Sequence, residues 1–365
     1  MLLRIVRGLI FLSFSHSLTS LWLTLTPSSS DGWFARGEEM ISPGQRGSDA
    51  GLIPPDDRIA MYFAGDVTLA HRFEEAIGDS VHKPFADFHL FRNADVAFVN
   101  LENPITVRGR KRILVEGGSA SGGKKFNFRM NPKYLVTLKD AGVSVVNLAN
   151  NHILDYGVMG LLDTIERLDS AGIRHCGAGR NLEEARAPVI LEIRGHRIAI
   201  LGYWGGGAGA AGVNKPGVAP RDLQIILGDV RSARTEHKAD IVIVSLHWGN
   251  ELDKSPRLWQ RTFAHRIIDA GANVVVGSHS HTIQPVESYH GGIIAYSLGN
   301  FLFGGNQVRQ YDTSVLEVVA ASAGLHSSKK LEWRLIPVRV TNGCVHVLPR
   351  IPRGKPDEQR WSGSN

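Results

Sequence analysis

Cysteine is scarce in this chain, and neither sign of charge is in large excess. The 365 residues include two cysteines, Cys176 and Cys344, so a disulfide framework is excluded, although one long-range bridge is not. Lys and Arg number 41 and Asp and Glu 35, which gives a net charge of +6. Zinc-finger spacing and aromatic-basic platforms are missing as well. We therefore expect no nucleic-acid partner.

Hydrophobic residues make up 43% of the sequence, yet runs long enough to cross a bilayer are confined to its start, which excludes a polytopic membrane protein. Residues 8–25 contain no Asp, Glu, Lys or Arg and follow Arg4 and Arg7. At about 1.5 Å per residue this run reaches roughly 27 Å. No small-residue cleavage site precedes the serines at 28–30. We predict a signal or membrane anchor at 1–27, retained rather than cleaved, with the following domain outside the cytoplasm; an unstructured start is the alternative.

The rest of the sequence divides into three parts by composition. Residues 28–57 are polar and rich in Gly, Ser and Pro, which predicts a flexible linker. We expect one folded domain at 58–349 and a polar tail at 350–365. No internal repeat of fixed period occurs.

Short apolar runs rich in β-branched residues predict buried strands. These runs lie at 58–64, 96–100, 143–148, 197–201, 241–246, 273–276 and 293–296. Amphipathic stretches of helical length occur at 132–141, 157–171 and 256–270, each ending at or just before a glycine. This alternation indicates an α/β layered domain. Three further strands, near 314–319, 331–340 and 343–348, have no helix between them and are expected to be antiparallel.

Almost every predicted strand is followed by a side chain that can bind a metal ion or transfer a proton. The residues are Asp66, Glu102, Asn150, Asn151, His152, His247, Glu251, His279 and His281. Because ligands bind at the carboxyl ends of strands in layered α/β folds, we expect these side chains to meet at one edge. Imidazole with carboxylate favours Zn²⁺, Mn²⁺ or Fe over Ca²⁺. An extended segment at 279–281 would point both histidine rings to one face, so that two neighbouring metals each take one.

Each of these residues also has a structural interpretation when taken alone. Asp66 follows a glycine and suits a turn, and Asn150 with Asn151 suits a turn or a helix cap. His247, at the end of an apolar strand, suits a core histidine. The occurrence of these residue types at five strand ends in one chain is what favours a metal site.

Other motifs give weaker indications. Residues 118–124 have the glycine and lysine spacing of a P-loop, but Lys125 stands where Ser or Thr is required and Pro132 follows soon, so we reject a P-loop. The sequence has no Gly-x-Ser-x-Gly elbow, which argues against a serine hydrolase. The basic residues 108–112, with Lys124 and Lys125, form either a solvated loop or a docking patch for an anionic polymer. Residues 202–217 form a flexible loop or a lid over the site.

A family resemblance rests on six segments: GDVTLA at 65–70, NLENPIT at 100–106, LANNHILDYG at 148–157, SLHWGNE at 245–251, GSHSHTIQPVE at 277–287 and SLGNF at 297–301. In order and spacing they resemble the CapA family, named for poly-γ-glutamate capsule synthesis, whose domain is similar to calcineurin-type metallophosphoesterases. The resemblance covers roughly residues 58–305. It implies an α/β fold, a metallophosphoesterase-like four-layer α/β/β/α sandwich, with two metal ions between the loops of the two sheets.

The resemblance also implies roles for individual residues. One metal would be held by Asp66 and His281, the other by Asn151, His247 and His279, with Glu102 in the place of a bridging Asp. His152 would be the proton donor, and Asp155 either orients its imidazole or is only a helix-start carboxylate. We also expect Asn150, Glu251 and Asn300 to contact substrate, although Asn300 alternatively closes a turn.

This sequence departs from the phosphoesterase pattern at two positions. Thr68 stands where those enzymes have a metal-binding His two residues after the first Asp, which predicts that the first metal is loosely held. Glu102 is one methylene longer than Asp, which would shift the bridge.

Two functional interpretations remain open from sequence. The first is a hydrolase of capsule or exopolymer synthesis, in which water activated by two divalent metal ions (Mn, Zn or Fe) attacks a phosphoester or an amide. The second is a non-catalytic, membrane-anchored scaffold that binds or guides an anionic polymer. In both we expect a domain outside the cytoplasm at the cell membrane, within a membrane capsule-synthesis complex.

Overall fold

The computed structural model describes residues 40–41, 58–111, 126–205, 207–304, 310–321 and 331–349. The predicted anchor at 1–27, the segment 118–124, Lys125 and the tail at 350–365 lie outside these ranges. None of the described helices combines the length and apolarity that a membrane span requires.

One sheet has eight strands. They are β2 (Arg58–Thr68), β3 (Val96–Leu101), β4 (Val145–Asn147), β5 (Arg174–Cys176), β14 (Asn300–Phe303), β15 (Gln310–Ala321), β16 (Glu332–Thr341) and β17 (Cys344–Val347). The order is β17-β16-β15-β2-β3-β4-β5, and β14 pairs with the end of β2. Strands β2 to β5 are parallel. The C-terminal strands β15, β16 and β17 are antiparallel, as predicted.

The second sheet has seven strands in the order β1-β12-β13-β11-β10-β8-β7. They are β1 (Met40–Ile41), β7 (Val189–Ile193), β8 (His196–Trp204), β10 (Ile241–His247), β11 (Val274–Ser278), β12 (Val286–Tyr289) and β13 (Gly292–Ala295). The four central strands are parallel, and the edges are antiparallel. A separate short pair joins β6 (Ala178–Gly179) to β9 (Gly217–Val218).

Strand side chains alternate between two cores because successive residues of a strand point to opposite faces. In β2, Ile59 and Met61 lie in a core that also contains residues of the second sheet, whereas Ala60 and Tyr62 lie in a core shared with helices. Strand β10 divides its residues in the same way on the other side. The two sheets therefore pack face to face between two helical layers.

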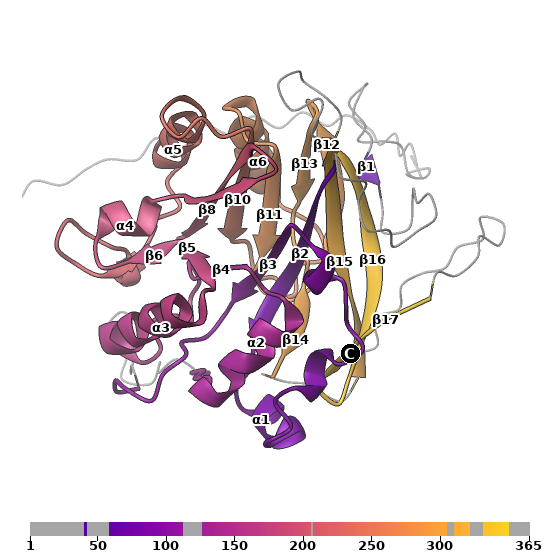
Figure 1. Ribbon diagram of the computed structural model, residues 1–365. Helices are drawn as coiled ribbons and strands as arrows, with labels where there is room; N and C mark the ends of the chain where they lie inside the picture. The colour runs from indigo at the N-terminus through magenta and orange to yellow at the C-terminus, as the bar shows by residue number, and fades with distance from the viewer. Residues whose placement is uncertain are drawn as a thin grey trace, which may run out of the picture. The chain divides into compact units, whose positions relative to one another are not determined.

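The helices form the outer layers. Their bounds are α1 (Arg72–Ile77), α2 (Leu135–Ala141), α3 (Gly157–Ala171), α4 (Leu182–Arg186), α5 (Leu223–Thr235) and α6 (Leu258–Asp269). Short 3-10 turns are η1 (Lys83–Phe85), η2 (Phe91–Asn93), η3 (Pro132–Tyr134) and η4 (Gly207–Gly209). Figure 1 shows α2 and α3 beside the first sheet and α5 and α6 beside β8, β10 and β11. The expected four-layer α/β/β/α sandwich is confirmed.

The predicted helix ends are also confirmed for two helices. Helices α2 and α3 end at Gly142 and Gly172, which adopt left-handed φ angles of 88° and 74°. Glycine takes this conformation without the steric penalty that a Cβ would add. Both helices consequently stop where their sequences predict.

The two cysteines are free, and the fold separates them. Cys176 ends β5 and Cys344 begins β17, at opposite edges of the eight-stranded sheet. Strand spacings of about 4.8 Å across this order put them roughly 29 Å apart, whereas a disulfide needs Cα atoms within about 7 Å. The long-range bridge that the sequence left open is therefore excluded.

Candidate metal centre

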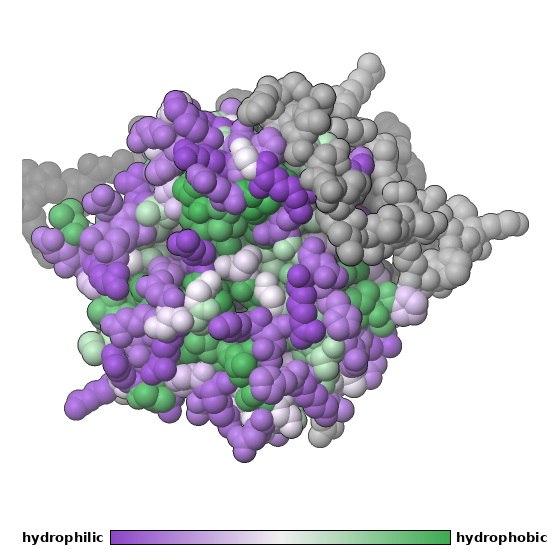
Figure 2. Space-filling model, in the orientation of Figure 1, coloured by the Kyte–Doolittle hydropathy of each residue, from purple (hydrophilic) through white to green (hydrophobic). Residues whose placement is uncertain are grey.

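Among the described acidic and histidine side chains, three have no solvent exposure. On the face seen in Figure 2, hydrophilic residues prevail and apolar residues form separate patches. Charged groups stay at such surfaces because burying one without compensation costs several kcal/mol. Asp66 and Glu102 are exceptions, since both are 0% exposed, and the imidazole of His247 is buried to the same extent. These three residues define the candidate site.

The carboxyl ends of strands from both sheets supply these residues. Asp66 lies near the end of β2, and Glu102 follows β3 directly. His247 is the last residue of β10, and His279 follows the last residue of β11. Parallel strands place their carboxyl ends at the same edge of a sheet. These side chains therefore meet, as predicted, because the central strands of each sheet are parallel.

The side chains form two groups of ligand type. Glu102, His247 and His279 make one group, and Asp66, Glu102 and His281 make the other; within each, one ligand atom per residue lies within 4.8 Å of the others. Glu102 belongs to both groups. The division agrees with the one that the family resemblance implies, since it separates His281 and Asp66 from His247 and His279.

Asn151 also reaches the first group. Its Oδ1 lies 2.8 Å from Nε2 of His247. Oε1 of Glu102 lies 3.5 Å from the same nitrogen. In this structure His247 thus faces both of the oxygen atoms that the resemblance pairs with it.

Asn100, the last residue but one of β3, connects the two groups and was not among the predicted site residues. Its Nδ2 donates to Asp66 Oδ1 at 2.8 Å and lies 3.3 Å from Nδ1 of His247. Its Oδ1 accepts from Asn147 Nδ2 at 2.9 Å. The available signal was an amide at an inward position of an otherwise apolar strand.

The backbone at the two neighbouring histidines differs from the prediction. We expected an extended 279–281 segment, but β11 ends at Ser278, and His279 and His281 have φ angles of 94° and 57°. Positive φ is sterically costly for a residue with a Cβ and is found where surrounding contacts hold it. Here the backbone N–H of His279 donates to Asp66 Oδ2 at 3.2 Å. The chain therefore turns back over Asp66, and each ring joins a different group.

Burial and neighbouring charges separate the histidine pKa values. Burial, with the nearby histidines, lowers the pKa of His247 well below its usual range. Burial likewise lowers the pKa of His279 to about 4. Burial also acts to lower the pKa of His281, but Glu102 and Asp66 outweigh it and raise that pKa to about 10. His247 and His279 are thus neutral at pH 7, the protonation state in which imidazole binds metals.

These residues fit a metal centre. Among the described residues, no hydrogen-bond partner faces the buried Nδ1 of His279. The neutral imidazoles of His247 and His279, with the buried carboxylates of Asp66 and Glu102, are the donor set that Zn²⁺, Mn²⁺ and Fe use. His281 is protonated at pH 7 beside these carboxylates and would have to lose that proton to bind a metal. The identity and number of metal ions stay predictions.

His152 lies next to the two groups in a hydrogen-bonded turn. Its Nδ1 is 2.7 Å from Asp155 Oδ2, and its Nε2 is 3.9 Å from Glu102 Oε1. The same Asp155 oxygen accepts from the backbone N–H of Phe128 at 2.7 Å, and the Phe128 ring lies 4.3 Å from the imidazole. This contact has the geometry that the first of the two interpretations of Asp155 requires, and the role of Asp155 stays a prediction.

The three residues predicted to contact substrate, and Thr68, lie at different positions around the ligand groups. Asn150 Nδ2 donates to the backbone oxygen of Leu101 at 2.8 Å, which ties the His152 turn to β3. Asn300 Oδ1 lies 2.8 Å from Nδ1 of His281. Glu251 is exposed, and its charge acts to raise the pKa of His279 against the larger effect of burial. Thr68 Oγ1 donates to the backbone oxygen of Glu102 at 3.3 Å, so it holds the Glu102 backbone in place.

Comparison with known proteins finds one matching family and similar capsule proteins. The family described as "Bacterial capsule synthesis protein PGA_cap" matches residues 60–305. "PGA biosynthesis protein CapA" of Bacillus subtilis (strain 168) is 34% identical over 269 residues, 72% of this chain and 68% of that protein. "Capsule biosynthesis protein CapA" of Bacillus anthracis is 30% identical over 270 residues, 72% of this chain and 64% of that protein.

Among solved structures, a 5'-nucleotidase precursor from Thermus thermophilus is similar at 14% identity and a TM-score of 0.46. The match covers 76% of this chain and 54% of that one.

Proposed function

The chain belongs to the bacterial capsule synthesis protein PGA_cap family, and from this premise we propose that it is a metal-dependent hydrolase of capsule-polymer synthesis. The observation that supports hydrolysis is the pair of ligand groups that share Glu102 beside an oriented His152. We propose a phosphoester or an amide of the polymer pathway as the bond that is cleaved.

Six side chains would hold the metal ions: Asp66, Glu102, Asn151, His247, His279 and His281. When bound, divalent cations lower the pKa of water and offset negative charge on a phosphoryl or acyl oxygen. Asn100 keeps the two ligand groups in register through its contacts with Asp66 and His247.

His152 is the proposed general acid. Because Asp155 holds Nδ1, the Nε2 atom is turned toward the ligand groups. As hydroxide, formed when a water molecule gives one proton to solvent, adds to the phosphorus or carbonyl carbon and the bond to the leaving atom breaks, Nε2 gives its proton to that leaving atom. The Phe128 ring against the imidazole limits the access of bulk water to it.

A specific observation favours the scaffold as a second candidate. Thr68 occupies the position of an expected metal-binding His, and its hydroxyl bonds to backbone, so this chain has one imidazole fewer than the phosphoesterase pattern. For either candidate we propose an anionic polymer as partner and a location outside the cytoplasm at the cell membrane.

Metal content and turnover, measured on the full-length protein, separate the candidates. Elemental analysis and hydrolysis of a generic phosphoester and of a γ-glutamyl amide with added Mn²⁺ or Zn²⁺ are compared for wild type, Asp66→Asn and His279→Ala. Matched controls are Asp79→Asn and His290→Ala, whose side chains are 97% and 63% exposed. Loss of metal and turnover in the first pair alone supports the hydrolase. Bound metal without turnover of either substrate favours the scaffold.

A further inference from the structure

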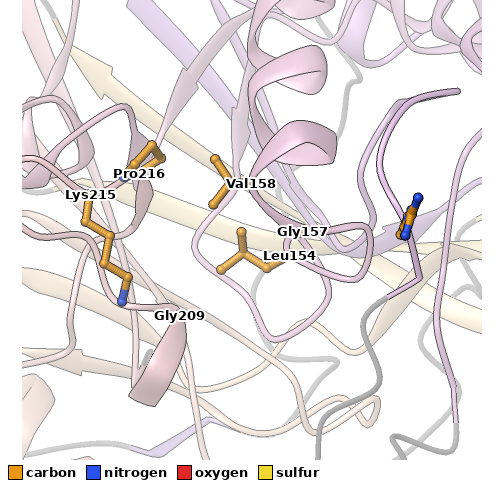
Figure 3. A pocket seen from close by; sticks show the side chains of 7 residues that line it. Leu154, Gly157, Val158, Gly209, Lys215 and Pro216 are labelled. Carbon is orange, nitrogen blue, oxygen red and sulfur yellow. The ribbon is translucent and has the colours of Figure 1, made fainter.

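A cavity of about 320 Å³ lies beside the His152 turn. Leu154, Val158 and Pro216 give it apolar walls, and the cationic side chains of Arg110 and Lys215 line it as well. Figure 3 shows Leu154 and Val158 facing Lys215 and Pro216 across the space. This volume is at the lower end of small-molecule sites, so it suits one or two units of a chain rather than a folded partner.

Two glycine contacts build this cavity from segments far apart in sequence. Gly109, with φ of 82°, packs so closely on the start of α3 that a Cβ would lie 2.1 Å from the Tyr156 carbonyl oxygen. Gly209 approaches Leu154 so that a Cβ would lie 2.9 Å from its Cδ1. Both loops are therefore held against the 150–157 turn, and each contributes one cation.

The two arginines of the 108–110 segment have different surroundings. Arg108 lies 3.3 Å from Glu166 and 3.7 Å from Asp163 on α3, so its charge is offset within the protein. Among the described residues, no carboxylate forms an ion pair with Arg110. The first turn of α3 has no acidic residue and no side-chain cap, and a helix N-terminus attracts negative charge. The charge of Arg110 and the N-terminus of α3 therefore both favour an anion at the cavity.

The ligand class follows from this lining. Two cations match one or two single negative charges, and the apolar walls match methylene groups between them. The lining has no hydroxyl side chain and no run of glycines to surround a phosphate. We propose that this cavity is a subsite for a carboxylate and adjoining methylenes of a polyglutamate-type chain.

The subsite lies beside the turn that carries the proposed general acid. Leu154 is two residues from His152, so their Cα atoms lie within about 7 Å of each other. A chain anchored at Arg110 and Lys215 would thus extend along the turn that holds the proposed general acid. The identity of the polymer rests on the proposed function, whereas the anion site rests on the cavity.

Binding of a labelled γ-linked glutamate oligomer to the full-length protein tests the subsite by fluorescence anisotropy at physiological ionic strength. We expect Arg110→Gln with Lys215→Gln to raise Kd about tenfold. The control Lys139→Gln with Arg174→Gln has the same net charge and alters two exposed cations elsewhere, so its Kd stays at the wild-type value. Val158→Trp keeps all charges, fills the cavity and is expected to weaken binding as well.

An equal loss in the control, or wild-type binding by Val158→Trp, overturns the subsite. Polyphosphate that binds more tightly through the same two cations would overturn the carboxylate assignment. The proposed hydrolase is judged separately, by turnover: binding that depends on Arg110 and Lys215 in a protein without turnover refutes the hydrolase and leaves the subsite. Turnover in a protein whose binding does not depend on Arg110 and Lys215 refutes the subsite and leaves the hydrolase.

Discussion

Glu102 is shared by both ligand groups, so its replacement by Gln has a specific thermal signature. At a metal concentration of about 100 times Kd, one occupied site adds about 2.7 kcal/mol to the free energy of unfolding. With about 2–4 °C of Tm per kcal/mol, one site raises Tm by roughly 5–11 °C. Glu102→Gln should lose most of the rise, because it removes a carboxylate from both groups. His279→Ala and His281→Ala should each lose only the part that belongs to one group.

The measurement is differential scanning fluorimetry of the full-length protein with chelator and with added Mn²⁺ or Zn²⁺. Glu317→Gln is the matched control, since Glu317 is also a buried carboxylate but accepts from Tyr62 at 2.6 Å and Arg334 at 2.9 Å, away from the ligand groups. Its absolute Tm should fall while the metal-induced rise stays the same. A full metal-induced rise in Glu102→Gln would refute the assignment of Glu102 to the centre.

Asp155→Asn should lower turnover about 10–100-fold with little change in KM, because the amide no longer fixes the His152 imidazole; steady-state kinetics beside Asp79→Asn measures this. Gly65→Ala should destabilise the fold by about 1–3 kcal/mol in urea titrations, since its Cβ would lie 1.9 Å from the Gly299 carbonyl oxygen. Gly228→Ala, within α5 where a Cβ meets nothing within 4 Å, should instead stabilise it by about 0.5–1 kcal/mol; equal effects of the two would contradict this packing. Because burial raises the pKa of Cys176 to about 12, its thiol should react with a maleimide only after denaturation; rapid labelling of the native chain would contradict its burial.

Much of the fold could be predicted from sequence because its strands are short, continuous apolar runs. Buried parallel strands produce such runs, and helices such as α3 show the helical period between them. The pairing of the strands was harder to predict from sequence. Strand β14 lies beside β2, with Asn300 opposite Asp66, and no local pattern indicates a partner so distant in sequence.

The candidate site shows the same limit. Residue types at strand ends predicted Asp66, Glu102 and the histidines, because the carboxyl ends of parallel strands meet. The positive φ angles at His279 and His281 were not predicted, because the contact between the His279 backbone and Asp66 joins segments far apart in sequence. Arg110 and Lys215 likewise line one cavity only because the loops that carry them pack on the 150–157 turn.

The distribution of ligand residues over both sheets also has a consequence for folding. Asp66 and the backbone of His279 are in contact although 213 residues separate them in sequence. Contacts of such high order form late, after the loops between them have closed. Neither sheet alone contains a complete ligand group. Metal binding at this place would therefore begin only when the two sheets have docked, and the onset of metal affinity during refolding would time that final step.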